Sequence, residues 1–361
     1  LILGLVATGY GVGGAFVGFG LAAALVTLGS LWVTRTGHIE ASTGPTLPWR
    51  RLIVFTVQSM GFVLFFNLLL QGDVIILKAA LLEAVSRDVM ATPTPAWVET
   101  LTQARAVDAS SPRDLTAALV GLYRAVKNLT LLPYQAVIAI ALVVFPLISR
   151  STASDDVEAT RAYSQQALRV SWLLVLAMVS VLGAGGYELV TTLFGDVYGP
   201  ASKALIPMSI AAACLALTYL MGTMLIAADH ARDAVGVVAL VSLGQMVGLY
   251  LFMGQSDAGP SGLRMASYIV CIAGLLGLLV AGLVTHRRLG VQPPWLALGR
   301  GALGCAVALL SVAWIELDPI VTIFVRPGIA AVVFVVVCVV TNELTSKDLS
   351  LIRSTLSGRT S

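Results

Sequence analysis

The chain has 361 residues, of which 58% are hydrophobic and only 11% charged, and its formal net charge is +3. Soluble domains carry about 25% charged residues, so these side chains cannot cover a water-exposed surface. The composition therefore excludes a soluble enzyme, a nucleic-acid-binding protein and a secreted disulfide scaffold. Apolar stretches of about 20 residues, the length that spans a bilayer, recur along the whole sequence. They predict an all-α, polytopic transmembrane helix bundle.

The predicted membrane spans alternate with short polar connections. The first stretch is only the end of a span. The sequence begins with apolar residues and has no basic n-region of the kind that opens a signal peptide, so a signal peptide is not indicated. We therefore expect this sequence to lack the N-terminal part of the protein. In chain order the spans cover 1–8, 15–33, 52–82, 118–148, 170–194, 204–228, 234–254, 265–285, 301–315 and 320–341.

The polar segments differ in length and in their local signals. Asp155, Asp156 and Glu158 are placed to favour the first turn of a surface helix, because acidic groups stabilise a helix N-terminus. The longest polar segment reads as an insert on the outer side of the membrane. The polar segments cover 34–51, 84–117, 149–169 and 342–361.

The placement of basic residues predicts the orientation in the membrane. Short cytoplasmic loops are enriched in Lys and Arg, so a cytoplasmic 34–51 linker puts most of the short-loop arginines on the same side. The C-terminal tail, 342–361, then lies in the cytoplasm. The basic residues assigned to this side are Arg35, Arg50, Arg51, Arg150, Arg161, Arg169, Arg232, Arg287, Arg288, Arg300, Lys347, Arg353 and Arg359.

The sequence gives no sign of a metal site, a disulfide framework or a cofactor. The cysteines lie singly inside apolar stretches, the histidines are scattered, and no phosphate-binding or hydrolase motif occurs. Chemistry on a covalent bond is therefore not expected, and the protein is predicted not to be an enzyme. The residues concerned are Cys214, Cys271, Cys305, Cys338, His38, His230 and His286.

Polar side chains interrupt the 52–82 span along one stripe. Asn67, Gln71 and Lys78 fall within about 40° of one another on an ideal helix. Asp73 lies about 120° away from this stripe, so we expect it to meet a different neighbour. Ionisable residues inside a membrane span usually face a cavity or a partner.

The 118–148 span carries a second group of polar residues, on two adjoining faces. Pro133 lies in the middle of the span, removes one backbone hydrogen bond and is expected to bend the helix. One face consists of Arg124, Asn128 and Gln135, and the other of Tyr123, Lys127, Thr130 and Tyr134.

The ionisable residues of these two spans leave two interpretations open. Lys78, Arg124 and Lys127 supply three cations against one acid, Asp73. The cations can snorkel to water at the outer interface, or they can line a hydrophilic cavity that holds an anionic headgroup. Glu188, near the end of its span, is either a membrane-edge residue or a site for a coupling ion.

Several short motifs, in their order and spacing, resemble those of the MOP superfamily flippases of the polysaccharide-exporter, or O-antigen, type. This superfamily also contains the lipid II flippases and the MATE drug exporters. The resemblance covers the chain from about residue 52 to 285. The motifs are 72–78 (GDVIILK), Tyr123, Pro133-Tyr134, 145–150 (FPLISR), 193–201 (LFGDVYGPA) and 205–208 (LIPM).

The resemblance implies two six-helix lobes around a cationic cavity, with two extra C-terminal helices. Residues 1–33 would be the remainder of the N-lobe, with about four earlier helices missing, and 34–51 a cytoplasmic linker. Residues 52–285 would be the C-lobe and 286–341 the two additional spans. The insert at 84–117 departs from the short outer loop of the family.

The resemblance further implies a transporter of the bacterial inner membrane that flips an undecaprenyl-diphosphate-linked oligosaccharide to the periplasmic leaflet. Membrane lipids and polysaccharide-assembly enzymes are its expected partners. A lipid II flippase and a MATE-type cation antiporter are the alternatives, followed by a membrane scaffold. The substrate is expected to contact Lys78, Arg124, Lys127, Asn67, Gln71, Asn128, Gln135 and Tyr134, with Asp73 and Glu188 as candidates for ion coupling.

Overall fold

A computed structural model of the chain describes residues 49–90, 96–105, 111–253, 259–292, 295–315 and 319–343, and before them the positions 21, 24, 25 and 28. The chain divides into two compact units, Leu1–Leu52 and Ile53–Ser361, and the description below concerns the second. The first two predicted spans, most of the 34–51 linker and the tail beyond Glu343 lie outside the described residues.

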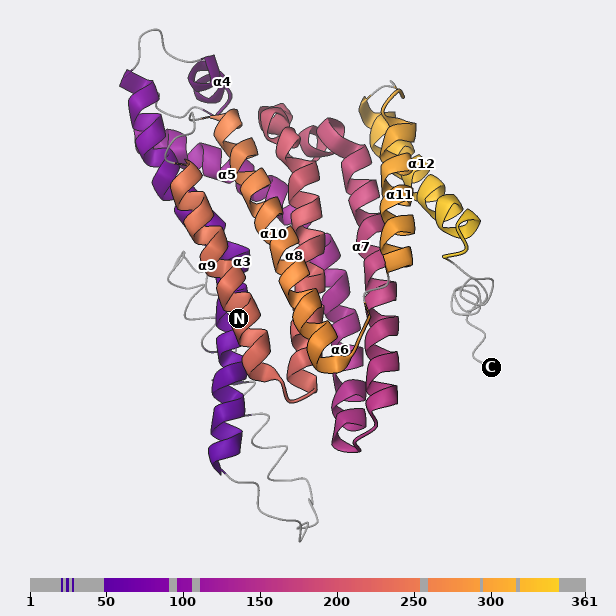
Figure 1. Cartoon of the computed structure of the whole chain (residues 1–361). Helices are drawn as coiled ribbons and strands as arrows, with labels where there is room; N and C mark the ends of the chain where they lie inside the picture. The colour runs from indigo at the N-terminus through magenta and orange to yellow at the C-terminus, as the bar shows by residue number, and fades with distance from the viewer. Residues whose placement is uncertain are drawn as a thin grey trace. The chain divides into compact units, whose positions relative to one another are not determined.

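The described part of the chain is all-helical (Figure 1). Its elements alternate with short connections, as the apolar and polar segments of the sequence predict. They are α3 (Trp49–Met90), α4 (Ala96–Arg105), α5 (Pro112–Thr130), α6 (Leu132–Ala153), α7 (Val157–Phe194), the 3₁₀ helix η2 (Asp196–Ala204), α8 (Leu205–Ala227), α9 (Ala231–Met253), α10 (Pro260–Leu289), α11 (Trp295–Val312) and α12 (Pro319–Val340).

Seven of the described helical segments are long and apolar enough to cross a membrane, and α11 contributes a shorter apolar helix at Leu296–Val312. This confirms the prediction of a polytopic membrane helix bundle. Many large apolar side chains face outward, among them Leu243, Val247 and Leu251 on α9. Such a surface is stable where lipid rather than water is the solvent.

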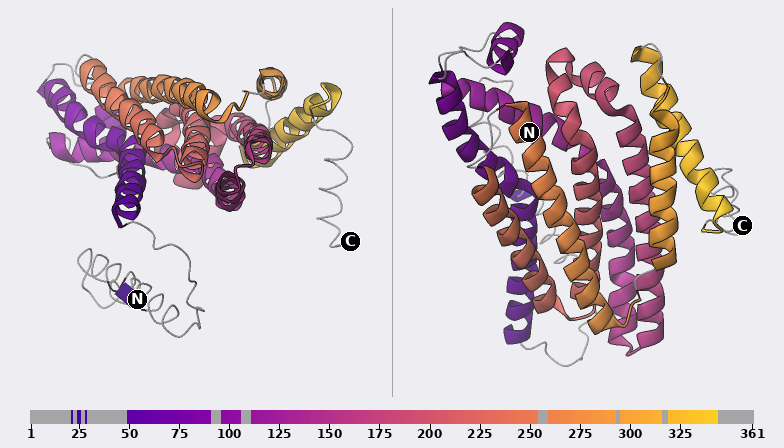
Figure 2. Two further views of the ribbon diagram at one scale, coloured as in Figure 1. Left: turned by 60° about the horizontal axis from the view of Figure 1, so that its bottom comes forward. Right: turned by 45° about the horizontal axis from the view of Figure 1, so that its top comes forward.

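Helix α8 lies at the centre of the bundle, where it packs against α6, α7, α9 and α10. Small residues let these helices approach closely, as is common between membrane helices. At Gly274 of α10, an added Cβ would lie 3.3 Å from the carbonyl oxygen of Ala211 on α8. Views from two further directions place α11 and α12 beside α7, at the opposite edge of the bundle from α3 and α9 (Figure 2).

The predicted 118–148 span is two helices rather than one bent helix. Helix α5 ends at Thr130, α6 begins at Leu132, and Leu131 serves as the cap of both. The cause is Pro133, which lies in the first turn of α6. A proline is tolerated at the start of a helix, where its missing N–H is not needed, but it interrupts a helix that would continue from α5. The two polar faces expected on one helix therefore divide at Leu131, and only α6 is apolar enough to be a candidate span.

The polar segment after α6 forms a helix start, as its acidic residues predict. The side chain of Asp156 caps α7 by accepting a hydrogen bond from the backbone N–H of Ala159 at 2.9 Å, and Glu158 lies in the first turn. The helix does not end at the membrane surface, however, but continues through the following span to Phe194. The surface helix and the span are thus one continuous element.

Helix α7 contains a sharp irregularity near its C-terminal end. Gly186 has φ +42° and ψ −124°, which is outside the helical region. Glycine adopts this conformation readily because it has no Cβ. The kink redirects the last turns of α7 toward η2, which packs against it.

Candidate functional site

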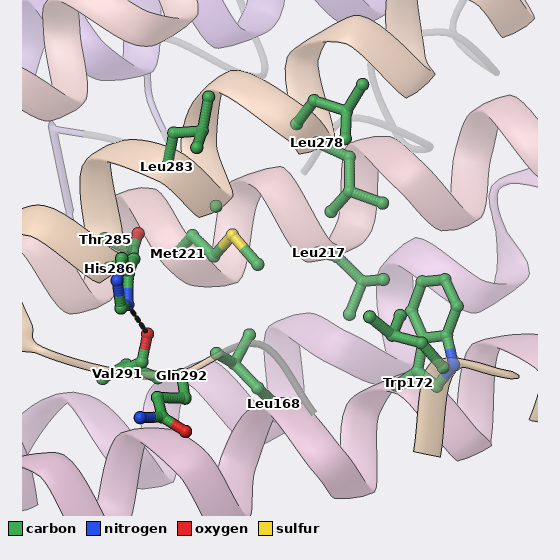
Figure 3. Close-up of a pocket in the computed structure, with 13 residues that line it drawn as sticks. Leu168, Trp172, Leu217, Met221, Leu278, Leu283, Thr285, His286, Val291 and Gln292 are labelled. Carbon is green, nitrogen blue, oxygen red and sulfur yellow. Dashed lines mark hydrogen bonds between the residues drawn. The ribbon is translucent and has the colours of Figure 1, made fainter. Parts of the chain in front are cut away.

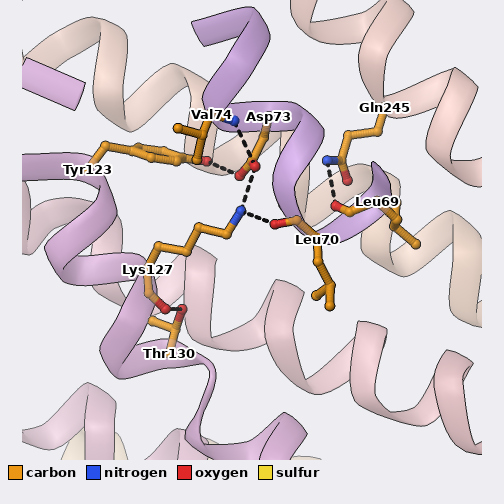
Figure 4. A network of polar contacts seen from close by, with 8 residues as sticks. All are labelled: Leu69, Leu70, Asp73, Val74, Tyr123, Lys127, Thr130 and Gln245. Carbon is orange, nitrogen blue, oxygen red and sulfur yellow. Dashed lines mark hydrogen bonds and ion pairs between the residues drawn. The ribbon is translucent and has the colours of Figure 1, made fainter. Parts of the chain in front are cut away.

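A buried carboxylate on α3 is at the centre of a polar network that joins three helices (Figure 4). The Asp73 side chain is 1% exposed. Its Oδ1 accepts from Lys127 Nζ at 2.5 Å and from the backbone N–H of Val74 at 2.8 Å. Its Oδ2 accepts from the hydroxyl of Tyr123 at 2.8 Å. Asp73 thus meets a neighbour away from the stripe of Asn67, as its angular position predicts.

The spacing of α5 explains how it supplies two of these donors. Tyr123 and Lys127 are four residues apart, so they lie on the same face of the helix. Both are buried against α3, whereas Arg124 and Asn128, one residue further along, are exposed. Helix α5 therefore turns one polar pair inward and another outward.

The network also uses the backbone of α3. Lys127 Nζ donates a second hydrogen bond to the carbonyl oxygen of Leu70. On the other side of α3, the buried Gln245 of α9 donates from Nε2 to the carbonyl oxygen of Leu69 at 3.1 Å. Side chains from α5 and α9 thus hold two successive carbonyls in the middle of a membrane span.

The ion pair between Asp73 and Lys127 lets both charges be buried. An isolated charge at this depth would be far more costly than the pair, which makes further hydrogen bonds to Tyr123, Val74 and Leu70. The positive charge of Lys127 is consequently neutralised within the protein. The ion pair fixes α5 on α3. On the same two helices, Lys78 and Arg124 have no acidic partner among the described residues.

The stripe predicted on α3 is an exposed face in the structure. Asn67, Gln71 and Lys78 are all exposed, and the amide of Asn67 donates to the carbonyl oxygen of Val63 in its own helix at 2.8 Å. On α5, the neighbouring exposed residues are Arg124 and Asn128. Their role as substrate contacts stays a prediction.

Tyr134 and Gln135 lie on α6, beyond the helix break. The Tyr134 ring packs against Phe66 and Tyr219, with ring centroids 5.6 and 5.5 Å apart, in an aromatic cluster between α3, α6 and α8. Gln135 is exposed. Because the break separates them from α5, these two residues do not continue its helical face.

Glu188 has a partner that the sequence did not indicate. Arg326 of α12 donates from Nη1 to Glu188 Oε1 at 3.0 Å and from Nε to the carbonyl oxygen of Ile315 at 2.8 Å. One guanidinium of α12 thus contacts both the last turns of α7 and the connection that follows α11. The role of Glu188 in ion coupling stays a prediction.

A second cluster fixes the other end of α12. Glu343 is buried, and its carboxylate accepts from Arg169 Nε at 2.8 Å and from Arg300 Nη1 at 3.4 Å. Glu343 was expected to belong to a polar tail, so this contact was not predicted. The partners are 174 and 43 residues away in the chain, and no periodic pattern links residues over such distances.

The described residues hold no group of three His, Cys, Asp or Glu side chains that could bind a metal ion. The residues that sequence reasoning missed at the central network are Tyr123, placed on a polar face but not assigned a role, and Gln245. A signal for Tyr123 existed, because it precedes Lys127 by four residues. Gln245 gave none beyond being an amide within an apolar stretch.

Among solved structures, the chain is similar to the lipid II flippase MurJ in its inward closed conformation, with a TM-score of 0.52 and 14% sequence identity. The match covers 63% of this chain and 48% of MurJ, so the chain spans about half of that protein's length. No family model and no curated protein matches the sequence. At this identity the likeness concerns the fold: the chain shares the helical fold of part of a lipid flippase.

Proposed function

We propose that the chain belongs to a MOP-type transporter that moves a lipid-linked, diphosphate-bearing oligosaccharide from the cytoplasmic to the periplasmic leaflet by alternating access. The fold similarity to MurJ supports a flippase rather than an enzyme. The observation that carries the proposal is the pair of exposed cations, Lys78 and Arg124, beside a buried ion pair that neutralises the remaining charges.

The chemistry of the substrate explains why two such cations are useful. A diphosphate with sugars attached cannot cross hydrocarbon unless polar groups replace its water. Ammonium and guanidinium groups form short, charge-assisted hydrogen bonds with phosphate oxygens. Asn67, Gln71 and Asn128, exposed on the same two helices, supply donors and acceptors for sugar hydroxyls.

In this proposal Lys127 acts by positioning α5, and Asp73 is the candidate for coupling. Protonation of Asp73 would remove the charge that holds Lys127 Nζ and so loosen the contact between α3 and α5. Glu188 is the weaker candidate, because its contact with Arg326 joins helices at the edge of the bundle.

The test removes both exposed cations. The double variant Lys78→Ala/Arg124→Ala is expected to abolish surface polysaccharide in the host while the protein level in the membrane stays unchanged. A matched control is Arg150→Ala/Arg232→Ala, which removes two exposed arginines at the ends of α6 and α9 and is expected to export normally. Normal polysaccharide in the Lys78/Arg124 double variant would refute the role of these two cations.

The second candidate is a lipid II flippase, which the similarity to MurJ favours. Complementation separates the two substrates. If the protein restores growth to cells depleted of their lipid II flippase, the substrate is lipid II. If it restores polysaccharide to an export mutant, the substrate is the oligosaccharide. A cation antiporter finds less support, because Asp73 is already neutralised by Lys127.

A further inference from the structure

A cavity of about 370 Å³ opens between α7, α8, α10 and the start of α11, away from the central network (Figure 3). Its walls are almost entirely apolar, with Leu217, Met221 and Leu278 among the side chains that line it. Leu279 and Leu283, also in the lining, are more than half exposed. The cavity is therefore reached from the apolar outer surface of the bundle.

Two polar atoms in the cavity wall lack partners. Thr285 is 1% exposed, and its Oγ1 has no hydrogen-bond partner. The indole Nε1 of Trp172 is also buried without a partner. Buried polar groups are normally satisfied, because an unpaired one costs free energy.

The polar lining residues gather at one end of the cavity. Figure 3 shows Thr285, His286 and Gln292 close together, with Trp172 and Leu217 at the other end. His286 and Gln292 are exposed, and His286 Nδ1 lies 3.0 Å from the carbonyl oxygen of Val291, which leaves Nε2 available. The cavity thus has an apolar interior and a polar mouth.

Two basic residues lie close to this end of the cavity, one in space and one in the chain. The guanidinium of Arg161 lies over the connection after α10, because a Cβ added at Gly290 would be 2.6 Å from Arg161 Nη2. Arg287 follows His286 directly and is exposed. Neither has an ion-pair partner among the described residues, whereas Arg288 pairs with Asp233 at 2.7 Å.

We propose that this cavity binds one acyl chain of an anionic glycerophospholipid, with the phosphate at Arg161, His286 and Arg287. The apolar walls fit the chain, and the cationic mouth fits the phosphate. A cavity of about 370 Å³ takes the end of one acyl chain. The site is independent of the transported substrate.

Filling the cavity tests the acyl-chain position. Gly282 lines it, and a Cβ added there meets no heavy atom within 4 Å. Gly282→Leu is therefore expected to occupy the cavity without disturbing the fold. Gly244→Leu is the matched control, because Gly244 lies in the span α9, outside the cavity, with equally open space at its Cβ. Both variants replace a helical glycine by the same residue.

Native mass spectrometry of the delipidated protein, titrated with phosphatidylglycerol, measures the affinity. Gly282→Leu is expected to weaken the tightest binding event by about tenfold or more, because the chain loses its buried surface, while Gly244→Leu binds as the unaltered protein does. Equal affinity in Gly282→Leu and the unaltered protein would refute the site. An affinity that falls equally in both variants would refute it as well.

A second set of variants tests the position of the phosphate headgroup. It consists of the double variant Arg161→Gln/Arg287→Gln and the control Arg150→Gln. The double variant is expected to lose the preference for phosphatidylglycerol over phosphatidylcholine, and Arg150→Gln is expected to keep it. Titration with undecaprenyl phosphate separates the two sources of a lipid phosphate. If Gly282→Leu abolished the binding of undecaprenyl phosphate but left the binding of phosphatidylglycerol unchanged, the site would belong to the carrier lipid and the proposal would be overturned.

Discussion

At the residue scale, the charged groups of the central network are interdependent. Lys127→Met leaves Asp73 buried without its cation, which costs about 3–5 kcal/mol of unfolding free energy. Adding Asp73→Asn to Lys127→Met is expected to recover much of the loss, because no unpaired charge remains. Denaturation of the purified variants in detergent micelles measures both effects.

Lys78→Met is the control for this series, since Lys78 is exposed on the same helix as Asp73. Its stability is expected to stay within about 0.5 kcal/mol of the unaltered protein. If Lys127→Met were as stable as Lys78→Met, the buried ion pair would not exist.

The same residues show how far the sequence determines a site. The angular offset of Asp73 from Asn67 and Gln71 predicted a separate neighbour, because helical geometry is regular over a few turns. Which neighbour it meets depends on how α5 packs, and that follows from a helix break that the sequence analysis took for a bend. Lys127 was thus found as an important residue but not as the partner of Asp73.

At the element scale, ion pairs hold α12 to α7 near both of its ends. Arg326→Ala removes the contacts with Glu188 and Ile315. Hydrogen exchange of the α12 amides is expected to speed up by about tenfold, equivalent to about 1.4 kcal/mol, while exchange in the central α8 stays unchanged. Mass spectrometry of exchanged peptides gives both rates.

Arg264→Ala provides the comparison for this prediction, because Arg264 is an exposed arginine on α10. It should leave the exchange of α12 as it is. Equal exchange of α12 in Arg326→Ala and the unaltered protein would mean that apolar packing alone holds the helix.

The elements themselves were largely predictable, since apolar length and charge-free composition mark a membrane span directly. Of the eight predicted spans within the described residues, each corresponds to an apolar helix, although 118–148 is shortened to α6. The contacts that order these helices were not predictable. Arg326 and Glu188 are 138 residues apart, and in a uniformly apolar sequence the pattern does not specify which helices are neighbours.

At the scale of the whole molecule, the short connections α6–α7, α8–α9 and α10–α11 lie at one end of the bundle (Figure 1), and arginines stand at or beside each of them: Arg150, Arg232, Arg287 and Arg288. Two contacts link these connections: Ser149 donates to the carbonyl oxygen of Ala227, and Arg288 pairs with Asp233. Because basic loops stay in the cytoplasm, this end is predicted to face the cytoplasm, together with the C-terminus.

Reporter fusions test this orientation. A fluorescent protein fused after Ser361 is expected to fluoresce, and a phosphatase that needs the periplasm is expected to be inactive there. The same phosphatase fused after Met253, at the far end of α9, is expected to be active. The reverse pattern of activities would invert the orientation.

The distance along the chain between Asp73 and Lys127 has a consequence for how the protein is made. The two residues are 54 positions apart, so at about 5–20 residues per second a ribosome adds Lys127 roughly 3–11 s after Asp73. During that interval the nascent α3 carries an acid without its counter-ion, which costs about 2.5–3.5 kcal/mol at the membrane centre on insertion scales. The apolar remainder of α3 must offset this cost until α5 emerges and Lys127 can pair with Asp73.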